Sequence, residues 1–137
     1  MSDKSPSCVL LADRHHALTE SVRGMLATAF GTVVMVADEA SLLDAADRLR
    51  PDVAVVDLSL AEHGGLGWLR EVRQRSPDLK VVVLSVHDEQ TIRRAAMQAG
   101  GDAFVLKRDI ATDLLAAIEF VRGGGDKATF SDDGQRT

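Results

Sequence analysis

The side chains in this sequence that suit phosphoryl chemistry all stand at or just after the end of an apolar run. Asp57 ends "VAVVD", Asp13 follows "CVLLA", Ser85 lies near the end of "VVVLSV", and Lys107 follows "AFVL". An aspartate carboxylate can act as a nucleophile and carry a phosphoryl group as an acyl phosphate. A lysine supplies positive charge, a hydroxyl supplies a hydrogen bond, and one or two carboxylates commonly hold Mg²⁺. These residue types suit phosphoryl transfer to a carboxylate if the fold brings them together.

The apolar runs that position these side chains are continuous rather than alternating, as in strands buried on both faces of a parallel sheet. They occupy 8–12, 33–37, 53–58, 81–86 and 103–106, with helical spacing of apolar residues after each one. This pattern predicts an α/β fold, a (βα)5 domain with a doubly wound, five-stranded parallel sheet in the flavodoxin-like order 2-1-3-4-5. In that order the candidate side chains share the carboxyl edge of the sheet, where ligands bind.

Two kinds of residue mark the ends of the expected helices. Gly100 and Gly123 stand where left-handed C-terminal caps are common. Asp88 and Asp109 precede helical segments and are the candidate N-caps.

The composition limits the class of protein. The 137 residues carry a net charge of −5, with 45% hydrophobic and 27% charged residues, which is typical of one globular domain. No stretch is dense enough in Lys and Arg to indicate direct nucleic-acid binding, and no apolar run reaches the ~20 residues that a membrane helix needs. We therefore expect a cytoplasmic domain at 8–123, a disordered N-terminus at 1–7, and a flexible tail or the start of a linker at 124–137.

Several segments resemble, in the right order, the receiver domains of two-component response regulators. They are "VLLADRH", "VVDLSLAEHGGL", "VVVLSVHDE" and "AGGDAFVLKRD", and the last two are most similar to the LuxR/NarL-type subfamily. The resemblance covers roughly 8–123 and implies a CheY-like fold. It also implies that a sensor histidine kinase phosphorylates Asp57, that Ser85 and Lys107 contact the phosphoryl group, and that Phe104 is the switch aromatic.

The same resemblance implies a signalling role rather than an enzyme, although such a domain assists its own phosphotransfer and dephosphorylation. Phosphorylation would switch the face formed by the fourth helix, fifth strand and fifth helix, and would control transcription through an attached or partner output domain. We expect a homodimer through that face or through the first and fifth helices. The alanine-rich fourth helix permits close approach to a second copy.

The sequence departs from the family where two consecutive acids are usual, because Asp13 is followed by Arg14. In the family the lost acid contacts the metal directly. In one arrangement Arg14 points inward, pairs with Asp57 and stands in for the cation. In the other, Arg14 turns to solvent, and Asp13, Asp57 and the backbone carbonyl of Ser59 hold Mg²⁺ more weakly. The alternative function is a pseudo-receiver, a protein-binding module that signals without phosphorylation.

Other functional classes fit the residues less well. The histidines lie in three different loops and are predicted to be surface residues rather than metal ligands: His15, His16, His63 and His87. Arg93 and Arg94 are predicted to form a solvated helix face. A haloacid-dehalogenase-type phosphatase requires a second acid where this chain has Ser59, and "DRHHALT" lacks the glycine of a flavodoxin phosphate cradle.

Overall fold

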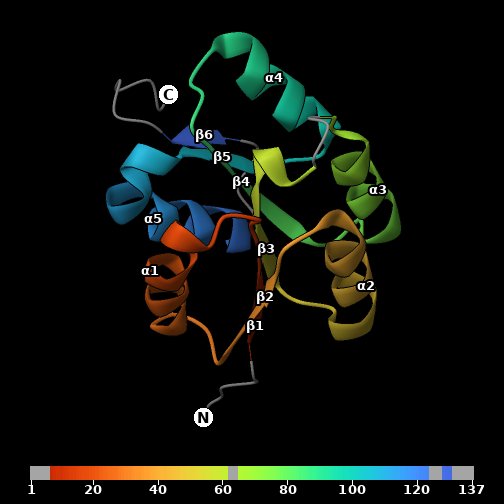
Figure 1. Cartoon of the computed structure of the whole chain (residues 1–137), viewed down its shortest axis with the longest axis vertical. Coiled ribbons are helices and arrows are strands. Elements are labelled where there is room, and N and C mark those ends of the chain that lie inside the picture. The colour runs from red at the N-terminus through yellow and green to blue at the C-terminus, as the bar shows by residue number, and fades with distance from the viewer. Residues whose placement is uncertain (1–6, 62–64, 124–127, 131–137) are drawn as a thin grey trace.

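A parallel β-sheet lies between two layers of helices in the computed structural model, which describes residues 7–61, 65–123 and 128–130 (Figure 1). The strands are β1 (Cys8–Ala12), β2 (Thr32–Val36), β3 (Val53–Asp57), β4 (Lys80–Ser85), β5 (Ala103–Leu106) and β6 (Ala128–Phe130). The helices are α1 (His16–Ala27), α2 (Glu39–Leu49), α3 (Gly67–Arg75), α4 (Gln90–Ala99) and α5 (Ile110–Arg122). Among the described residues, no helix is both long enough and apolar enough to cross a membrane.

The strands follow the order β2-β1-β3-β4-β5-β6, and every neighbouring pair is parallel. The predicted order 2-1-3-4-5 is therefore confirmed. The short strand β6 was not predicted, and it pairs along the outer edge of β5, with Thr129 opposite Phe104. Of the segment 124–137, predicted to be a flexible tail or linker, only 128–130 lie within the described residues. The predicted disorder at 1–7 falls almost entirely outside them.

Strand β3 shows why the apolar runs are continuous. All of its residues are buried, and successive side chains enter opposite layers of the core. Ala54 and Val56 pack in the layer that contains α2, α3 and α4, whereas Val53 and Val55 pack in the layer that contains α1 and α5. Figure 1 shows these two groups of helices on opposite sides of the sheet. Asp57 is therefore the last residue of a strand that is covered on both faces.

Of the four residues predicted to cap helices, only one does so as predicted. Gly100 follows α4 with a φ of 137°, a conformation that favours glycine, as predicted. The prediction for Gly123 is wrong, because its φ is −81°. Asp88 lies one residue before the N-cap of α4, and its carboxylate contacts Arg108 (3.3 Å) instead of capping the helix. Asp109 occupies the N-cap of α5, but its side chain makes no capping hydrogen bond.

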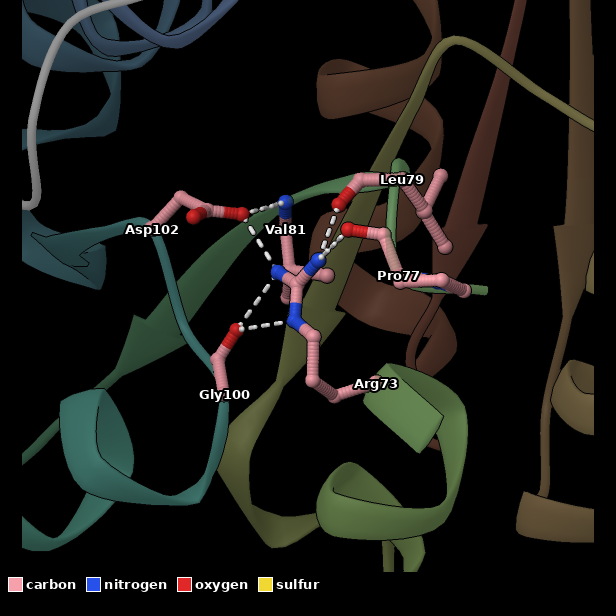
Figure 2. A network of polar contacts seen from close by, with 6 residues as sticks. All are labelled: Arg73, Pro77, Leu79, Val81, Gly100 and Asp102. Atoms are coloured by element: carbon pink, nitrogen blue, oxygen red, sulfur yellow. Dashed lines mark hydrogen bonds and ion pairs between the residues drawn. The ribbon is translucent and has the colours of Figure 1, made fainter. Parts of the chain in front are cut away.

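At the amino ends of β4 and β5, Arg73 joins several segments through one guanidinium group (Figure 2). It donates hydrogen bonds to three backbone carbonyls and one carboxylate: Pro77 (2.9 Å), Leu79 (2.7 Å), Gly100 (2.7 Å) and Asp102 (2.6 Å). The same oxygen of Asp102 also accepts the N–H of Val81 (2.8 Å). The C-terminal ends of α3 and α4 are thereby tied to the starts of two neighbouring strands.

Candidate functional site

Three of the side chains predicted for the site meet at the carboxyl edge of the sheet. The Nζ of Lys107 lies 3.2 Å from Oδ1 of Asp57 and 3.4 Å from Oδ2 of Asp13. Both acids are almost fully buried, with Asp13 4% and Asp57 2% exposed. Ion pairs in such surroundings are weakly screened by solvent. The structure thus gathers a lysine and two carboxylates into one compact charged cluster.

The register of the sheet explains this meeting. Ala12 of β1 is opposite Val56 of β3, so the residues that follow these two in the chain, Asp13 and Asp57, come side by side. Lys107 follows β5, which is separated from β3 by β4 alone, and its long stem spans that gap. The backbone also orients Asp13, because its Oδ1 accepts the N–H of His15 at 2.8 Å.

The second carboxylate oxygen of Asp57 has a partner that the sequence analysis missed. The hydroxyl of Ser59 donates a hydrogen bond to Oδ2 of Asp57 at 2.6 Å. Only the backbone carbonyl of Ser59 was predicted to take part in the site. The spacing of two residues brings the hydroxyl near the carboxylate, but no sequence pattern specifies this bond between two side chains. Both oxygens of Asp57 are therefore engaged, one by an ammonium and one by a hydroxyl.

Ser85 lies at the end of β4 and is buried beside the cluster, as predicted, but its hydroxyl points to a different partner. Its Oγ accepts the N–H of His87 (2.9 Å) and donates to the carbonyl of His87 (3.2 Å). These bonds hold the start of the loop between β4 and α4. To donate to a phosphoryl group on Asp57, the hydroxyl would have to turn its hydrogen away from the carbonyl of His87.

The side chain of Arg14 is exposed, and within the described part of the chain it makes no ion pair with Asp57. The structure thus favours the outward arrangement. The two negative charges of Asp13 and Asp57 and the positive charge of Lys107 then give a net charge of −1. No cluster of three or more His, Cys, Asp or Glu side chains that could hold a metal occurs among the described residues. Two carboxylates still fit Mg²⁺, which is often bound through one or two of them and several waters.

A groove of about 360 Å³ opens beside the cluster. Its apolar lining comes from the β3–α3 connection, the β4–α4 loop and α4: Leu58, Leu66, Val86, Ile92 and Ala95. Its polar lining consists of His15, Asp57, Ser59, Ser85, His87 and Lys107. The buried phosphoacceptor candidate therefore borders a groove whose lining is both apolar and polar.

Phe104, the predicted switch aromatic, is fully buried in β5 and packs in the same core layer as α4. The guanidinium carbon of Arg93 lies 5.7 Å from the centre of its ring, within cation–π range. Arg93 is only 8% exposed, so the prediction of a solvated residue is wrong, whereas Arg94 is exposed. Arg93 lies three residues before the buried Ala96, and this spacing turns it toward the sheet.

Among the described residues, no histidine belongs to a cluster that could hold a metal. His15 and His87 are exposed, as predicted, and Nδ1 of His87 lies 3.8 Å from a carboxylate oxygen of Glu89. The side chain of His16 and all of His63 lie outside the described residues.

Comparison with known proteins identifies the family. Residues 9–119 match the family model described as "Response regulator receiver domain". The chain therefore belongs to the response regulator receiver domain family. Members of this family are signalling domains rather than ordinary enzymes, and they generally bind Mg²⁺ at their acidic site.

Among response regulators, the similar proteins are of the NarL, DegU and LuxR type. The chain is 29% identical over 119 residues to the transcriptional regulatory protein DegU of Brevibacillus brevis, covering 85% of this chain and 50% of that protein. It is 32% identical over 120 residues to the nitrate/nitrite response regulator NarP of Escherichia coli, covering 86% and 56%. The chain spans about half the length of the curated relatives it matches.

A solved structure agrees with this type. A LuxR-family two-component response regulator from an Aurantimonas species superposes with a TM-score of 0.83 at 26% identity, covering 94% of this chain and 92% of that one. The fold described above, with its five strands in the order 2-1-3-4-5, is thus the CheY-like fold of receiver domains.

Proposed function

We propose that Asp57 accepts a phosphoryl group from a sensor histidine kinase in the cytoplasm, and that the modification switches a protein-interaction face in transcriptional control. The observation that carries this proposal is the pairing of the buried Asp57 with Lys107 at the open end of β3. A carboxylate in this position is reached through the groove, and an adjacent ammonium can balance charge on the phosphoryl oxygens.

In the transfer step one oxygen of Asp57 attacks the phosphorus of the kinase's phosphohistidine. The new O–P bond forms as the P–N bond breaks, and the imidazole leaves with the electron pair. The attacking oxygen is either Oδ1, which lies beside Lys107, or Oδ2, which accepts the hydroxyl of Ser59. Asp13, Asp57 and the carbonyl of Ser59 would hold Mg²⁺, whose charge would neutralise the phosphoryl oxygens. Hydrolysis of the acyl phosphate within the same pocket would return the domain to its resting state.

Binding of Mg²⁺ is expected to be weaker than in a pocket with three acids, because Arg14 supplies a cation where the family has a carboxylate. At an effective dielectric near 20, like charges ~4 Å apart repel by roughly 4 kcal/mol. The exposure of Arg14 reduces this cost to a fraction, and a quarter of it still corresponds to about a fivefold loss in affinity. Restoring the acid should therefore recover at least about fivefold in Mg²⁺ affinity.

The test is labelling by acetyl phosphate together with a Mg²⁺ titration. Arg14→Asp should tighten Mg²⁺ binding and speed labelling, whereas Asp57→Ala should abolish labelling. Arg94→Asp is the matched control, because it makes the same charge change on an exposed arginine of α4. If Arg14→Asp behaves like Arg94→Asp in both assays, Arg14 does not influence the site.

The alternative is a pseudo-receiver, and the residue that favours it is Arg14, which stands where the family has the second acid of the pocket. In this case the face of α4, β5 and α5 would bind its partner in the resting state. Absence of labelling in the unmodified chain and in Arg14→Asp, at saturating Mg²⁺, would establish this alternative over phosphorylation.

In the phosphorylated domain, Ser85 would turn from His87 to the phosphoryl group, and Phe104 and α4 would adjust with it. A homodimer would then form through α4, β5 and α5, or through α1 and α5. The first of these faces includes the edge of β5 that β6 now pairs with, so dimerisation there must include or displace β6. Sedimentation with and without a phosphoryl analogue tests this, and a monomer at high concentration in both conditions contradicts it. The output domain would be attached or would be a partner protein.

A further inference from the structure

The outer edge of β5 is where the sixth strand joins the sheet. β5 pairs with β4 on one side and with β6 on the other, and residues 103–105 are opposite residues 128–130. A sheet edge without a neighbouring strand presents backbone N–H and C=O groups that pair readily with another chain. The edge of β5 is therefore a surface that accepts a strand, and β6 shows the direction and register in which the strand pairs.

The connection from β5 to β6 has the opposite hand from the other connections of the sheet. The chain steps toward the β6 edge from β2 to β3, from β3 to β4 and from β4 to β5, and the helices α2, α3 and α4 pack in one core layer. From β1 to β2 it steps the other way, but α1 packs in the opposite layer, so the hand is the same. From β5 to β6 it steps toward the β6 edge again, whereas α5 packs in the layer of α1 (Figure 1).

This reversed hand makes the pairing of β6 within one chain unfavourable. About 98% of crossovers between parallel strands are right-handed, because a right-twisted strand followed by a right-handed helix packs back onto the sheet only in that way. The four connections that agree are therefore right-handed, and the connection through α5 is left-handed. β6 has only three residues with which to offset this cost. The same pairing between two chains carries no such cost, because the rule applies only to strands that one chain connects.

We propose that β6 pairs with β5 of a second copy of this chain, and that two copies exchange these strands in a symmetric homodimer. Each copy donates residues 128–130 and accepts the same residues from the other, in the register described above. The connection between α5 and β6 begins with three consecutive glycines, at 123–125, which permit the change of direction that an exchange requires. The exchange needs no phosphoryl group, so it stands apart from the proposed function.

The concentration at which the dimer forms measures the cost of the left-handed connection. A short connection presents β6 to its own β5 at an effective concentration in the millimolar range. Exchange without any gain would therefore need millimolar protein, and release from the left-handed connection lowers this concentration. In sedimentation equilibrium of the full chain, without Mg²⁺ or phosphoryl donor, we expect a dimer well below about 1 mM.

A proline in β6 tests whether this strand forms the interface. Thr129→Pro removes a backbone N–H from the middle of β6. Because each dimer contains two exchanged strands, the variant should weaken dimerisation by about tenfold or more. Gln135→Pro introduces the same residue beyond β6 and is the matched control, which should leave dimerisation unchanged.

A disulfide between two different chains tests the exchange directly. Ala103 is opposite Ala128, and the spacing of neighbouring strands, about 4.8 Å, places the two Cα atoms within the range of a disulfide. With Cys8 replaced by serine in both, one chain carries Ala103→Cys and the other carries Ala128→Cys, and they are mixed in a glutathione redox buffer. The exchange predicts that mass spectrometry finds these two chains linked. Ala116→Cys, on the exposed face of α5, replaces Ala103→Cys in the control mixture and should link much less.

Three outcomes would overturn the proposal: a monomer at about 1 mM, a dimer that Thr129→Pro does not weaken, or no more linkage than in the control mixture. If Ala103→Cys does not fold, as judged by circular dichroism, sedimentation of the unmodified chain and of Thr129→Pro still decides. A dimer that appears only with a phosphoryl analogue would contradict the exchange and support the proposed function. Absence of acetyl-phosphate labelling would contradict only the proposed phosphorylation, because the exchange experiments contain no phosphoryl donor.

Discussion

Replacement of Arg73 by methionine removes the guanidinium of Figure 2 and keeps most of the apolar stem. Three backbone carbonyls lose a donor, and the carboxylate of Asp102 loses its ion pair but keeps the N–H of Val81. A net hydrogen bond contributes about 1 kcal/mol, and one to a charged group about 1.5–3 kcal/mol. Arg73 and Asp102 are 27% and 22% exposed, so water replaces part of what is lost. The expected cost is about 2–4 kcal/mol in the free energy of unfolding.

Arg75 provides a matched control on the same helix. It pairs with Asp47 (3.0 Å) and Glu71 (2.9 Å), but it is 44% exposed, and such surface pairs contribute roughly 0–1 kcal/mol. Arg73→Met, Arg75→Met and Arg73→Lys would be compared by urea unfolding. With a slope of about 2 kcal/mol per molar urea, Arg73→Met should lower the midpoint by about 1–2 M and Arg75→Met by much less. Arg73→Lys should recover little, because an ammonium cannot reach acceptors on both sides of the fork.

A midpoint for Arg73→Met close to that of Arg75→Met would refute this reasoning. It would mean that water satisfies the four acceptors as well as the guanidinium does, and that the segments joined in Figure 2 hold together by packing alone.

The remaining predictions concern glycine conformation and the single cysteine. Gly100→Ala should destabilise the fold by more than about 1 kcal/mol in thermal melts, because the φ of Gly100 is 137° and the new methyl would lie 3.0 Å from Cβ of Arg73. Gly67→Ala is the control, because its methyl would enter open space in the first turn of α3. It should be neutral or stabilising in the same melts. Burial and, to a smaller extent, the nearby carboxylate of Asp52 raise the pKa of the Cys8 thiol, so its alkylation should be slow at pH 8. Asp52→Asn should lower that pKa and speed alkylation less than tenfold, and no change in rate would show that burial alone controls the thiol.

The sheet and the charged cluster could be predicted because both follow from position along the chain. A strand with no polar position between Val53 and Val56 must be covered on both faces, and parallel strands present their carboxyl ends at one edge. Asp57 and Lys107 were placed by this rule, and their atoms lie 3.2 Å apart.

Side-chain direction and edge pairing could not be predicted in the same way. Arg93 and Arg94 are chemically identical neighbours, and only the rotation of α4 against β5 buries one and exposes the other. The hydroxyl of Ser59 reaches Asp57 because of local backbone geometry, which composition does not reveal. Strand β6 pairs with β5 through backbone groups. Because β6 is short and lies in a polar, glycine-rich stretch, it has no apolar pattern from which a strand could be predicted.

The network around Arg73 also determines how α4 can move. Its guanidinium holds the carbonyl of Gly100, at the last turn of α4, while the first turn adjoins the loop that Ser85 anchors through His87. The C-terminal end of α4 is thus held in place, whereas its N-terminal end has more freedom to move. Ten residues give α4 a length of about 15 Å, so a tilt of about 10° displaces its first turn by about 2.6 Å and its last turn hardly at all. Any such tilt would therefore move Ile92, which lies at the near end of α4 and borders the groove.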